Sequence, residues 1–298
     1  MESLLFTGGT GFLGANVKPI LDRMYQVTTI GISDNDEIKA NLAKDVPILP
    51  KRYDIVLHAA GKAHVYPKTE VEKQSFFDIN FIGTKHLCMA LEKVGTPHAF
   101  IFISSAAVYG DELAENIKES APLNGNTPYA ISKIQAERHL IKWCREHNVV
   151  LGILRPSLLV GKNAPGNLGA MVKGIQKGYY FNIAGGNAHK SFLMAEDIAN
   201  IVPLIVNKGG IYNVCDTRQP TYGEISASIA RQLGKRTPFS LPYWLAWCAA
   251  KVGDVFGSKF PIDSNRLHKM VTSCTLSNEK IKRELKWNPI DVLDNYRI

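Results

Sequence analysis

The 298-residue sequence is poor in cysteine and lacks long apolar runs. Its five cysteines are scattered, odd in number and without a CxxC pair, which excludes a disulfide framework or a zinc site and predicts reduced thiols. No apolar run approaches the roughly 20 residues that span a bilayer. The N-terminus has neither a basic segment nor a small-residue cleavage site, so we expect no signal peptide and a cytoplasmic location.

Aspartate and glutamate are outnumbered by lysine and arginine, 27 against 35, and the net charge is +8. The basic residues are spread along the chain and form no stripe interleaved with aromatic residues, so we expect no nucleic-acid partner. The dense basic stretch at 280–283 is typical of a solvated helix face or, alternatively, of attraction to an anionic substrate or membrane surface. The apolar stretch Tyr243–Phe256 predicts a helix packed in the core or, alternatively, one lying at a membrane interface.

Short apolar segments alternate with helical patterns in the first half of the chain. This predicts an α/β fold with a doubly wound parallel sheet, the Rossmann fold. The predicted strands are 4–7, 27–32, 54–59, 99–104 and 149–154, and the predicted helices are 15–23, 77–94, 128–146, 197–207 and 222–233. We expect a loop at 161–169, and no helix at 45–53, which is short and interrupted by proline. An NAD(P)-binding domain is expected at 1–160 and a smaller, mainly substrate-binding α/β region at 161–298, with residues of about 181–215 returning to the sheet.

A glycine-rich turn, TGGTGFLG, follows the first predicted strand. Gly8 permits a tight turn, Gly11 lets the backbone approach a pyrophosphate, and Gly14 lets the helix pack closely on the strand. The start of the helix offers free N–H groups to phosphates. The turn therefore predicts a dinucleotide site, with Thr10, Phe12 and Leu13 completing it.

The end of the second strand usually carries an acidic residue that binds the adenosine ribose. Here Gly31 stands at that position, and the acid is missing or displaced to Asp34. Ser33 can donate to a ribose hydroxyl or to a 2′-phosphate. Gly31 removes the repulsion that would exclude NADP, so the sequence favours NADP slightly over NAD.

Tyr129 and Lys133 form a YxxxK pair on a predicted helix, with Thr127 as the expected N-cap. Positions i and i+4 share one helix face, so we expect the ammonium to lie near the phenol and to lower its pKa. Tyr129 then becomes a general acid or base. Ser105 directly follows the fourth predicted strand, where ligands of an open parallel sheet lie, and its hydroxyl can bond a substrate oxygen.

Together these motifs resemble the extended short-chain dehydrogenases/reductases, the branch that includes nucleotide-sugar epimerases, dehydratases and reductases. The resemblance covers nearly the whole chain and rests on TGGTGFLG, HAAG, INFIGTKHL, SSAAVYG, PYAISK, LRPSLLVG, HKSFLMAEDIA and RELKWNP, in the order of the family. It implies that Ser105, Tyr129 and Lys133 are catalytic and that Tyr129 and Lys133 also contact the cofactor. It implies further cofactor contacts at Asn41, Leu42, Ala59, Ala60, Gly61, Asn80, Ser104 and Pro156, and substrate contacts at Asn167, Leu168, Lys190 and Arg266.

The resemblance also orders the possible functions. Ala106 and Ala107 stand where 4,6-dehydratases carry an Asp-Glu pair, which disfavours a dehydratase. A 4-keto-sugar reductase acting on a UDP-hexose-type substrate in polysaccharide biosynthesis is the first hypothesis. A UDP-hexose or UDP-N-acetylhexosamine 4-epimerase with tightly bound NAD is the alternative, and a non-catalytic NAD(P)-binding regulator is a remote one. Relatives of this kind dimerise through the helices at 77–94 and 128–146, so a homodimer is expected.

Overall fold

A seven-stranded parallel sheet with the order β10-β6-β5-β4-β1-β2-β3 forms the centre of the protein. The computed structural model describes residues 1–63, 67–110, 114–256 and 262–298. The strands of this sheet are β1 (Ser3–Thr7), β2 (Gln26–Gly31), β3 (Ile38–Lys39), β4 (Ile55–His58), β5 (Ala99–Ile103), β6 (Val150–Pro156) and β10 (Gly210–Val214). The predicted Rossmann fold is confirmed, and the two edge strands, β3 and β10, have no counterpart among the predicted strands.

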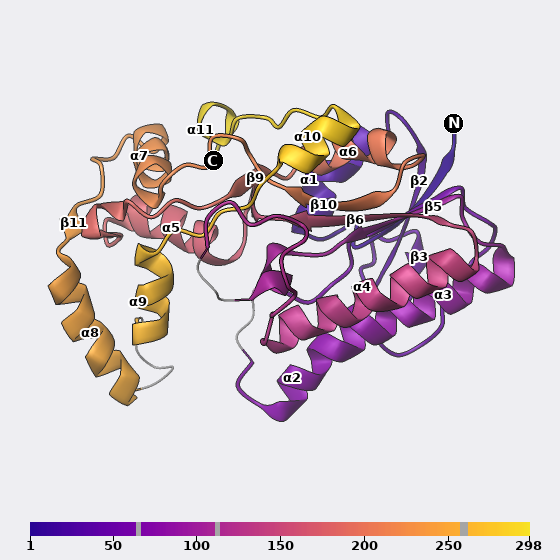
Figure 1. Ribbon diagram of the computed structural model, residues 1–298, viewed down its shortest axis with the longest axis horizontal. Helices are drawn as coiled ribbons and strands as arrows, with labels where there is room; N and C mark the ends of the chain where they lie inside the picture. The colour runs from indigo at the N-terminus through magenta and orange to yellow at the C-terminus, as the bar shows by residue number, and fades with distance from the viewer. Residues whose placement is uncertain (64–66, 111–113, 257–261) are drawn as a thin grey trace.

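Helices cover both faces of the sheet (Figure 1). On one side lie α1 (Phe12–Leu21), α6 (Asp197–Ile205) and α10 (Glu279–Leu285), and on the other α3 (Gly83–Val94) and α4 (Pro128–Glu146). Successive side chains of a strand point to opposite faces. Leu4 and Phe6 of β1 therefore pack with Val17 of α1, whereas Leu5 packs with Leu87 of α3. Two buried faces explain why these strands are apolar without a break.

The helix predicted at 77–94 is longer than expected and contains a π turn. It begins as α2 (Glu70–Phe77), widens into the π turn η1 (Asp78–Ile82) and continues as α3. Thr69 caps its start by accepting a hydrogen bond from the Glu72 N–H. π turns within helices are frequent at functional sites, and Asn80 lies in this one.

The helix α4 begins at the predicted residue. The Thr127 side chain accepts a hydrogen bond from the Ala130 N–H, and Pro128 occupies the first turn, where its missing N–H leaves no helical bond unmade. The described part of 45–53 forms no helix, as predicted.

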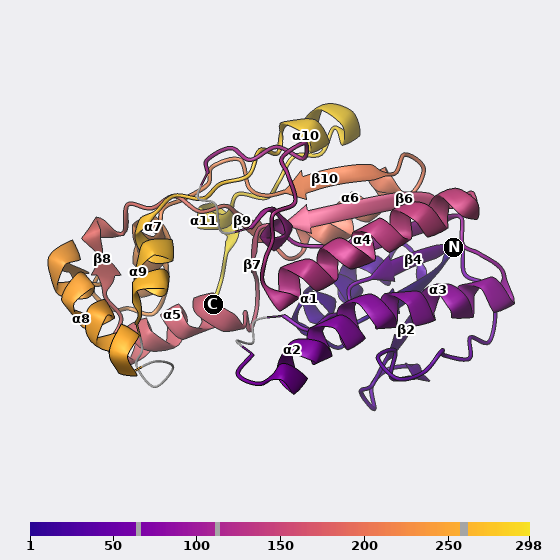
Figure 2. The ribbon, with the colours of Figure 1, turned by 60° about the horizontal axis from the view of Figure 1, so that its bottom comes forward.

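The remaining elements form a second lobe beside the sheet (Figure 2). They include β7 (Leu158–Val160), α5 (Gly166–Lys177), β8 (Asn182–Ile183), β9 (Phe192–Met194), α7 (Tyr222–Gln232), β11 (Ser240–Leu241), α8 (Tyr243–Phe256), α9 (Ser264–Val271) and α11 (Val292–Asn295). The predicted loop at 161–169 is wrong at its end, because α5 begins at Gly166 and buries Leu168 against α7. Among the described helices, none is long and apolar enough to cross a membrane.

Candidate active site

A cavity of about 810 Å³ lies at the carboxyl ends of β1, β4, β5 and β6, between the sheet and the second lobe. This is the edge at which open parallel sheets bind ligands. Among the predicted site residues, the cavity is lined by Gly8, Gly11, Phe12, Leu13, Ala59, Ala60, Gly61, Ser104, Ser105, Tyr129, Lys133, Pro156, Asn167, Leu168 and Lys190. The predicted residues Thr10, Gly14, Ser33, Asn41, Leu42, Asn80 and Arg266 do not line it.

The glycine-rich turn has the shape that a dinucleotide diphosphate requires. Gly8 has a φ of +78°, and a Cβ there would lie 2.8 Å from the Ala60 nitrogen. A Cβ on Gly14 would lie 2.2 Å from the Gly9 carbonyl oxygen, so the helix packs too closely for a side chain. Gly11 is the N-cap of α1. No side chain accepts a hydrogen bond from the N–H groups at this end of the helix, and the first turn has no acidic residue. The N–H groups of this turn therefore face the cavity ready for an anion, and the turn fits NAD(P).

Tyr129 and Ser105 meet across the cavity from α4 and the end of β5. A hydrogen bond from the Ser105 side chain lowers the pKa of Tyr129, but burial has the larger effect and raises it above its ordinary value. The prediction that the pKa of Tyr129 is lowered is therefore wrong for this structure. Phe76 of α2 packs its ring edge-on against Tyr129 at 6.2 Å between centroids, which fixes the orientation of the phenol.

Lys133 lines the cavity and is almost fully buried. Its Nζ donates a hydrogen bond to the Ile103 carbonyl oxygen at 2.9 Å and lies 4.7 Å from the centre of the Phe102 ring. Burial lowers the pKa of Lys133 to about 8, while the nearby Glu137 carboxylate acts in the opposite direction. A lysine with a pKa near neutral can exchange a proton at physiological pH, which an exposed lysine cannot.

Asn80 connects the two halves of this site. Its side chain donates to the Ser132 hydroxyl at 2.9 Å and to the Lys62 carbonyl at 3.2 Å, and accepts from the Lys62 N–H at 2.7 Å. A Cβ on Gly61 would lie 3.0 Å from the Asn80 Oδ1 and 3.1 Å from the Lys133 Nζ. The residue expected to contact the cofactor therefore supports the turn after β4 and the helix α4.

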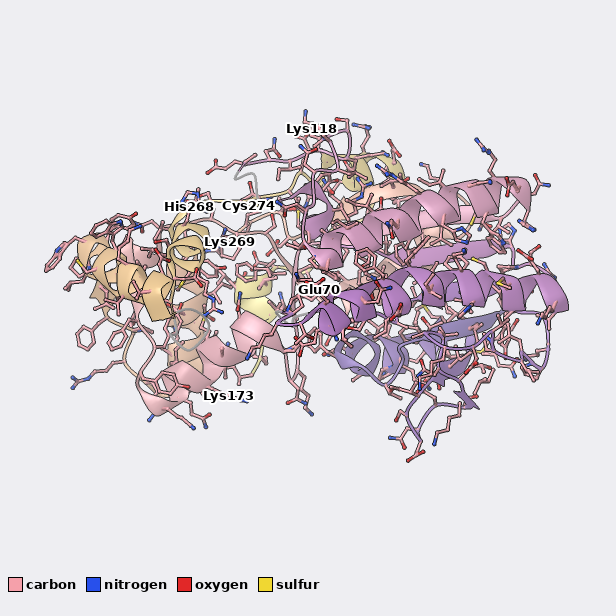
Figure 3. The ribbon with its side chains drawn as sticks, turned by 90° about the horizontal axis from the view of Figure 1, so that it is seen from below. Glu70, Lys118, Lys173, His268, Lys269 and Cys274 are labelled. Carbon is pink, nitrogen blue, oxygen red and sulfur yellow. The ribbon has the colours of Figure 1, made fainter. Side chains whose placement is uncertain are left out.

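Two lysines converge at the other end of the cavity. Lys190 is buried and lies against the Tyr222 ring, and its pKa is lowered, first by burial and also by the positive charge of Lys269. Lys269 of α9 lines the cavity near Cys274, where the second lobe meets the sheet (Figure 3). Arg266, one turn earlier on α9, is exposed, pairs with Asp263 at 3.3 Å and does not line the cavity. Lys269, which the sequence motifs did not single out, takes the place expected of Arg266.

Comparisons with known proteins identify the family. Residues 4–215 match the NAD dependent epimerase/dehydratase family, which is well over half of the chain. The chain belongs to this family. It is therefore an enzyme of the extended short-chain dehydrogenase/reductase type, whose members include nucleotide-sugar epimerases, dehydratases and reductases.

Relatives with established names cover most of the chain at low identity. UDP-glucose 4-epimerase of Vibrio cholerae is 26% identical over 98% of this chain and 92% of its own. N-acetyl-alpha-D-glucosaminyl-diphospho-ditrans,octacis-undecaprenol 4-epimerase of Escherichia coli O157:H7 is 26% identical over 94% and 88%. GDP-6-deoxy-D-mannose reductase of Pseudomonas aeruginosa is 26% identical over 77% and 79%.

Solved structures show the same fold. UDP-glucose 4-epimerase of Thermotoga maritima with UDP-glucose has a TM-score of 0.76 and 19% identity over 99% of this chain and 96% of its own. RMD of Pseudomonas aeruginosa complexed with NADPH has a TM-score of 0.76 and 20% identity over the same shares of the two chains.

In this family member, an acidic residue does lie at the end of β2, and it comes from outside the strand. Asp36 is buried, and its Oδ2 accepts hydrogen bonds from the Ser33 N–H at 3.1 Å and from the Thr10 hydroxyl at 3.4 Å. A Cβ on Gly31 would lie 2.4 Å from that oxygen, so the glycine makes room for the carboxylate. The Asp36 Oδ1 is buried without a hydrogen-bond partner among the described residues. By contrast, Asp34 is exposed and pairs with Lys39.

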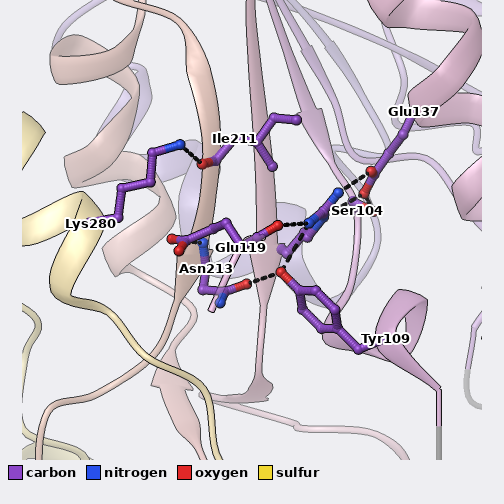
Figure 4. A network of polar contacts seen from close by, with 8 residues as sticks. Ser104, Tyr109, Glu119, Glu137, Ile211, Asn213 and Lys280 are labelled. Atoms are coloured by element: carbon purple, nitrogen blue, oxygen red, sulfur yellow. Dashed lines mark hydrogen bonds and ion pairs between the residues drawn. The ribbon is translucent and has the colours of Figure 1, made fainter. Parts of the chain in front are cut away.

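A buried polar network lies next to the cavity, around Ser104 and Glu137 (Figure 4). Arg155 and Glu137 form a bidentate ion pair, at 2.6 Å and 3.0 Å, with side chains 4% and 1% exposed. The Ser104 hydroxyl donates to Glu137 and is therefore committed to the network, although Ser104 lines the cavity. Arg155 also donates to the Tyr109 hydroxyl at 2.9 Å. The network fixes the residues that flank Ser105.

Proposed function

We propose that this enzyme reduces the C4 ketone of a hexose carried on a diphosphate. The arrangement of the cavity supports this proposal: Ser105, Tyr129 and Lys133 lie at its sheet end, and Lys190 and Lys269 lie at its lobe end. A neutral carbonyl needs hydrogen-bond donors and a proton source, whereas a diphosphate needs cations. One elongated ligand with a ketone at one end and a diphosphate at the other satisfies both sets.

Each residue at the sheet end has a defined part in the reduction. The Ser105 hydroxyl donates to the ketone oxygen and polarises it, and Tyr129 delivers a proton to that oxygen as it becomes a hydroxyl. Its raised pKa keeps Tyr129 protonated and ready to donate at neutral pH. NAD(P)H supplies the hydride when bound. Lys133, with a pKa of about 8, can return a proton to the phenolate.

The carrier of the sugar is proposed to be a nucleotide, UDP before other nucleotides. The relatives named above carry their sugars on UDP, on GDP or on diphospho-undecaprenol, and these carriers share a diphosphate next to the sugar. Lys190 and Lys269 recognise that shared group, and Asn167 lies beside it at the start of α5. Parallel assays with a UDP-linked and an undecaprenyl-diphosphate-linked 4-keto sugar distinguish the two sources.

For the cofactor, the position of Asp36 favours NAD(H) over NADP(H), against the slight preference inferred from Gly31. A carboxylate at the end of β2, beside Ser33 and Thr10, can accept a hydrogen bond from a ribose hydroxyl and repels a 2′-phosphate. We expect Asp36→Asn to raise the KM for NADH about tenfold or more, the loss of a charge-assisted hydrogen bond. Asp34→Asn, on the exposed neighbour, is the matched control and should leave the KM for NADH unchanged. Equal effects of the two substitutions would refute the assignment.

A 4-epimerase is the second candidate, and the same Asp36 favours it because epimerases of this family retain NAD through the cycle. Nucleotides released from the purified protein and identified by mass spectrometry show whether NAD is retained. Consumption of NADH that requires a UDP-linked 4-keto sugar identifies a reductase. Interconversion of two UDP-hexoses without added cofactor identifies an epimerase.

Tyr129→Phe tests both candidates, because it removes only the transferable proton. We expect kcat to fall about a hundredfold or more with little change in the KM for the sugar. A near wild-type rate would refute this catalytic assignment and favour the non-catalytic regulator.

We further propose that the enzyme acts in the cytoplasm, in polysaccharide biosynthesis, as a homodimer formed through α3 and α4. Met89 of α3 and Ile141 of α4 are 45% and 43% exposed on these helices, which supports the proposed dimer surface. Light scattering of the wild type and of a Met89→Glu/Ile141→Glu variant tests it, and a wild-type monomer would refute it.

A further inference from the structure

The helix α8 points its small residues inward and its large apolar residues outward. Ala246, Ala250 and Gly253 are buried, and Ala246 and Ala250 pack with Leu267 of α9 and Ile183 of β8. On the outward side, Trp244 is 63% exposed and Val255 is 81% exposed. Of the two alternatives drawn from the sequence, core packing fails for this outer face, because a core helix would bury its indole rings.

The outward face of α8 continues onto a neighbouring strand pair. β11, just before α8, pairs with β8, and the Asn182 N–H donates to the Phe239 carbonyl at 2.9 Å. This pairing brings exposed Phe181 and Phe239 together. We call the exposed apolar side chains of residues 179–181 and 239–255 the α8 patch. It holds nine of the eighteen large exposed apolar side chains in the described part of the chain, although it spans only 20 residues, so the exposure is concentrated there.

The surroundings of the α8 patch are basic. No aspartate or glutamate occurs from residue 225 to 253, whereas this segment contains Arg231, Lys235, Arg236 and Lys251. No acidic residue occurs from 166 to 195 either, the segment that supplies α5 and β8. Asp254 partly offsets Lys251, at 3.5 Å. The patch therefore combines Trp, Tyr and Phe with an excess of positive charge.

This combination selects between two possible occupants. In a symmetric dimer, the same patch would face itself, and Lys235 and Arg236 of one copy would approach those of the other. Like charges brought together in this way oppose association. An anionic bilayer offers the complementary charge, and its interface favours indole and phenol rings beside lysine and arginine.

We propose that the enzyme docks on an anionic bilayer surface through the α8 patch. With 14 residues, α8 is about 21 Å long, so it lies along the interface and does not span the roughly 30 Å hydrocarbon core. It forms the outer edge of the second lobe in both ribbon views, far from the sheet (Figures 1 and 2).

Docking there would place the cavity close to the bilayer. α8 packs on α9 through Ala246, Ala250 and Leu267, and Lys269 of α9 lines the cavity. One helix thus separates the docking surface from the diphosphate end of the cavity. The docking proposal rests on the surface alone and does not depend on which sugar or carrier the enzyme uses.

Two tryptophans in the patch provide an intrinsic signal. Trp143 and Trp287 are each 4% exposed, whereas Trp244 and Trp247 are 63% and 46% exposed. The probe is a vesicle of phosphatidylcholine in which about one lipid in three is the anionic phosphatidylglycerol. These vesicles are expected to shift the tryptophan emission of the protein to the blue, and the protein is expected to sediment with them. Trp244→Ser/Trp247→Ser should lower partitioning at least about tenfold. Lys235→Gln/Arg236→Gln should lower it about 25-fold, at about fivefold per charge, and leave weak binding to pure phosphatidylcholine unchanged.

Ile48→Ser is the matched control, because Ile48 is 92% exposed but lies on the loop between β3 and β4, outside the patch. It should partition like the wild type. The proposal is overturned if the wild type does not bind these vesicles or if the tryptophan variant binds as well as the wild type. It is also overturned if light scattering shows a dimer that the tryptophan variant alone converts to monomers. If the tryptophan variant does not fold, the charge variant still decides the question.

Discussion

Replacing Glu137 with alanine should destabilise the protein far more than loss of a surface acid. The substitution leaves the Arg155 guanidinium, 3% exposed, without its carboxylate and leaves the Ser104 hydroxyl without its acceptor. Breaking a buried pair from one side costs about 3–5 kcal/mol in the free energy of unfolding. For a chain of 298 residues, the entropy of unfolding is about 0.6 kcal/mol/K, so the melting temperature should fall by about 5–8 °C.

Glu70→Ala is the control, because Glu70 forms an exposed ion pair with Lys73 at 2.6 Å. Such pairs contribute at most about 1 kcal/mol, or less than about 2 °C here. Differential scanning calorimetry measures both variants. Glu137→Leu/Arg155→Met, which removes both charges and keeps the volume, should recover much of the loss. Equal melting temperatures of Glu137→Ala and Glu70→Ala would refute the expected cost of breaking the buried pair. A double variant with a lower melting temperature than Glu137→Ala would refute it as well.

Three further substitutions separate folding from binding and catalysis. Gly14→Ala should lower the free energy of unfolding by about 3 kcal/mol, because its Cβ would lie 2.2 Å from the Gly9 carbonyl oxygen. Gly11→Ala, whose Cβ would have its nearest contact at 3.4 Å, should fold normally but bind the cofactor weakly. Equal melting temperatures of the two variants would contradict this. Lys133→Met should abolish activity yet keep or raise stability at pH 7, by up to about 3 kcal/mol, because burial lowers the pKa of Lys133 to about 8 in the folded chain. Since the unfolded chain then binds more protons between pH 8 and 10.5, wild-type stability should rise relative to the variant over that window, and urea titrations at several pH values measure this. Lys269→Met should raise the KM for the diphosphate-linked sugar about tenfold or more with a small change in kcat, and an effect confined to kcat would remove Lys269 from the diphosphate site.

Local sequence patterns predicted the parts of the site that a single segment determines. The glycine-rich turn, the helix α4 with its Thr127 cap, and the position of Ser105 after β5 each depend on a few neighbouring residues, and the structure has them as expected. Five of the seven strands of the sheet were predicted, because burial on both faces makes them apolar throughout, whereas β3 and β10 were not.

The parts that were missed depend on contacts between distant segments. Asp36 reaches the end of β2 only because β3 pairs with β2 and turns the connecting loop back toward Gly31 and Thr10. Lys269 lines the cavity in place of Arg266 because α9 packs its Leu267 side against α8, which sets the rotation of the helix. The sequence left two surroundings open for the helix α8, the core or a membrane interface, since an apolar helical pattern is the same whether a core or a bilayer covers it.

The π turn at Asp78–Ile82 rotates the side-chain positions of α2 about the helix axis relative to those of α3. Its wider turn contains one residue more than an α turn needs, so the helix can present Phe76 and Asn80 to the active site and Leu87 and Leu91 to the sheet at the same time. Deleting one residue from this turn would restore an unbroken α-helix and rotate α2 by about 100° about its axis relative to α3. The packing of the sheet would survive, but the ring that orients Tyr129 would leave its place. The extra residue thus lets one helix pack against the sheet along α3 and reach the cavity residue Tyr129 along α2.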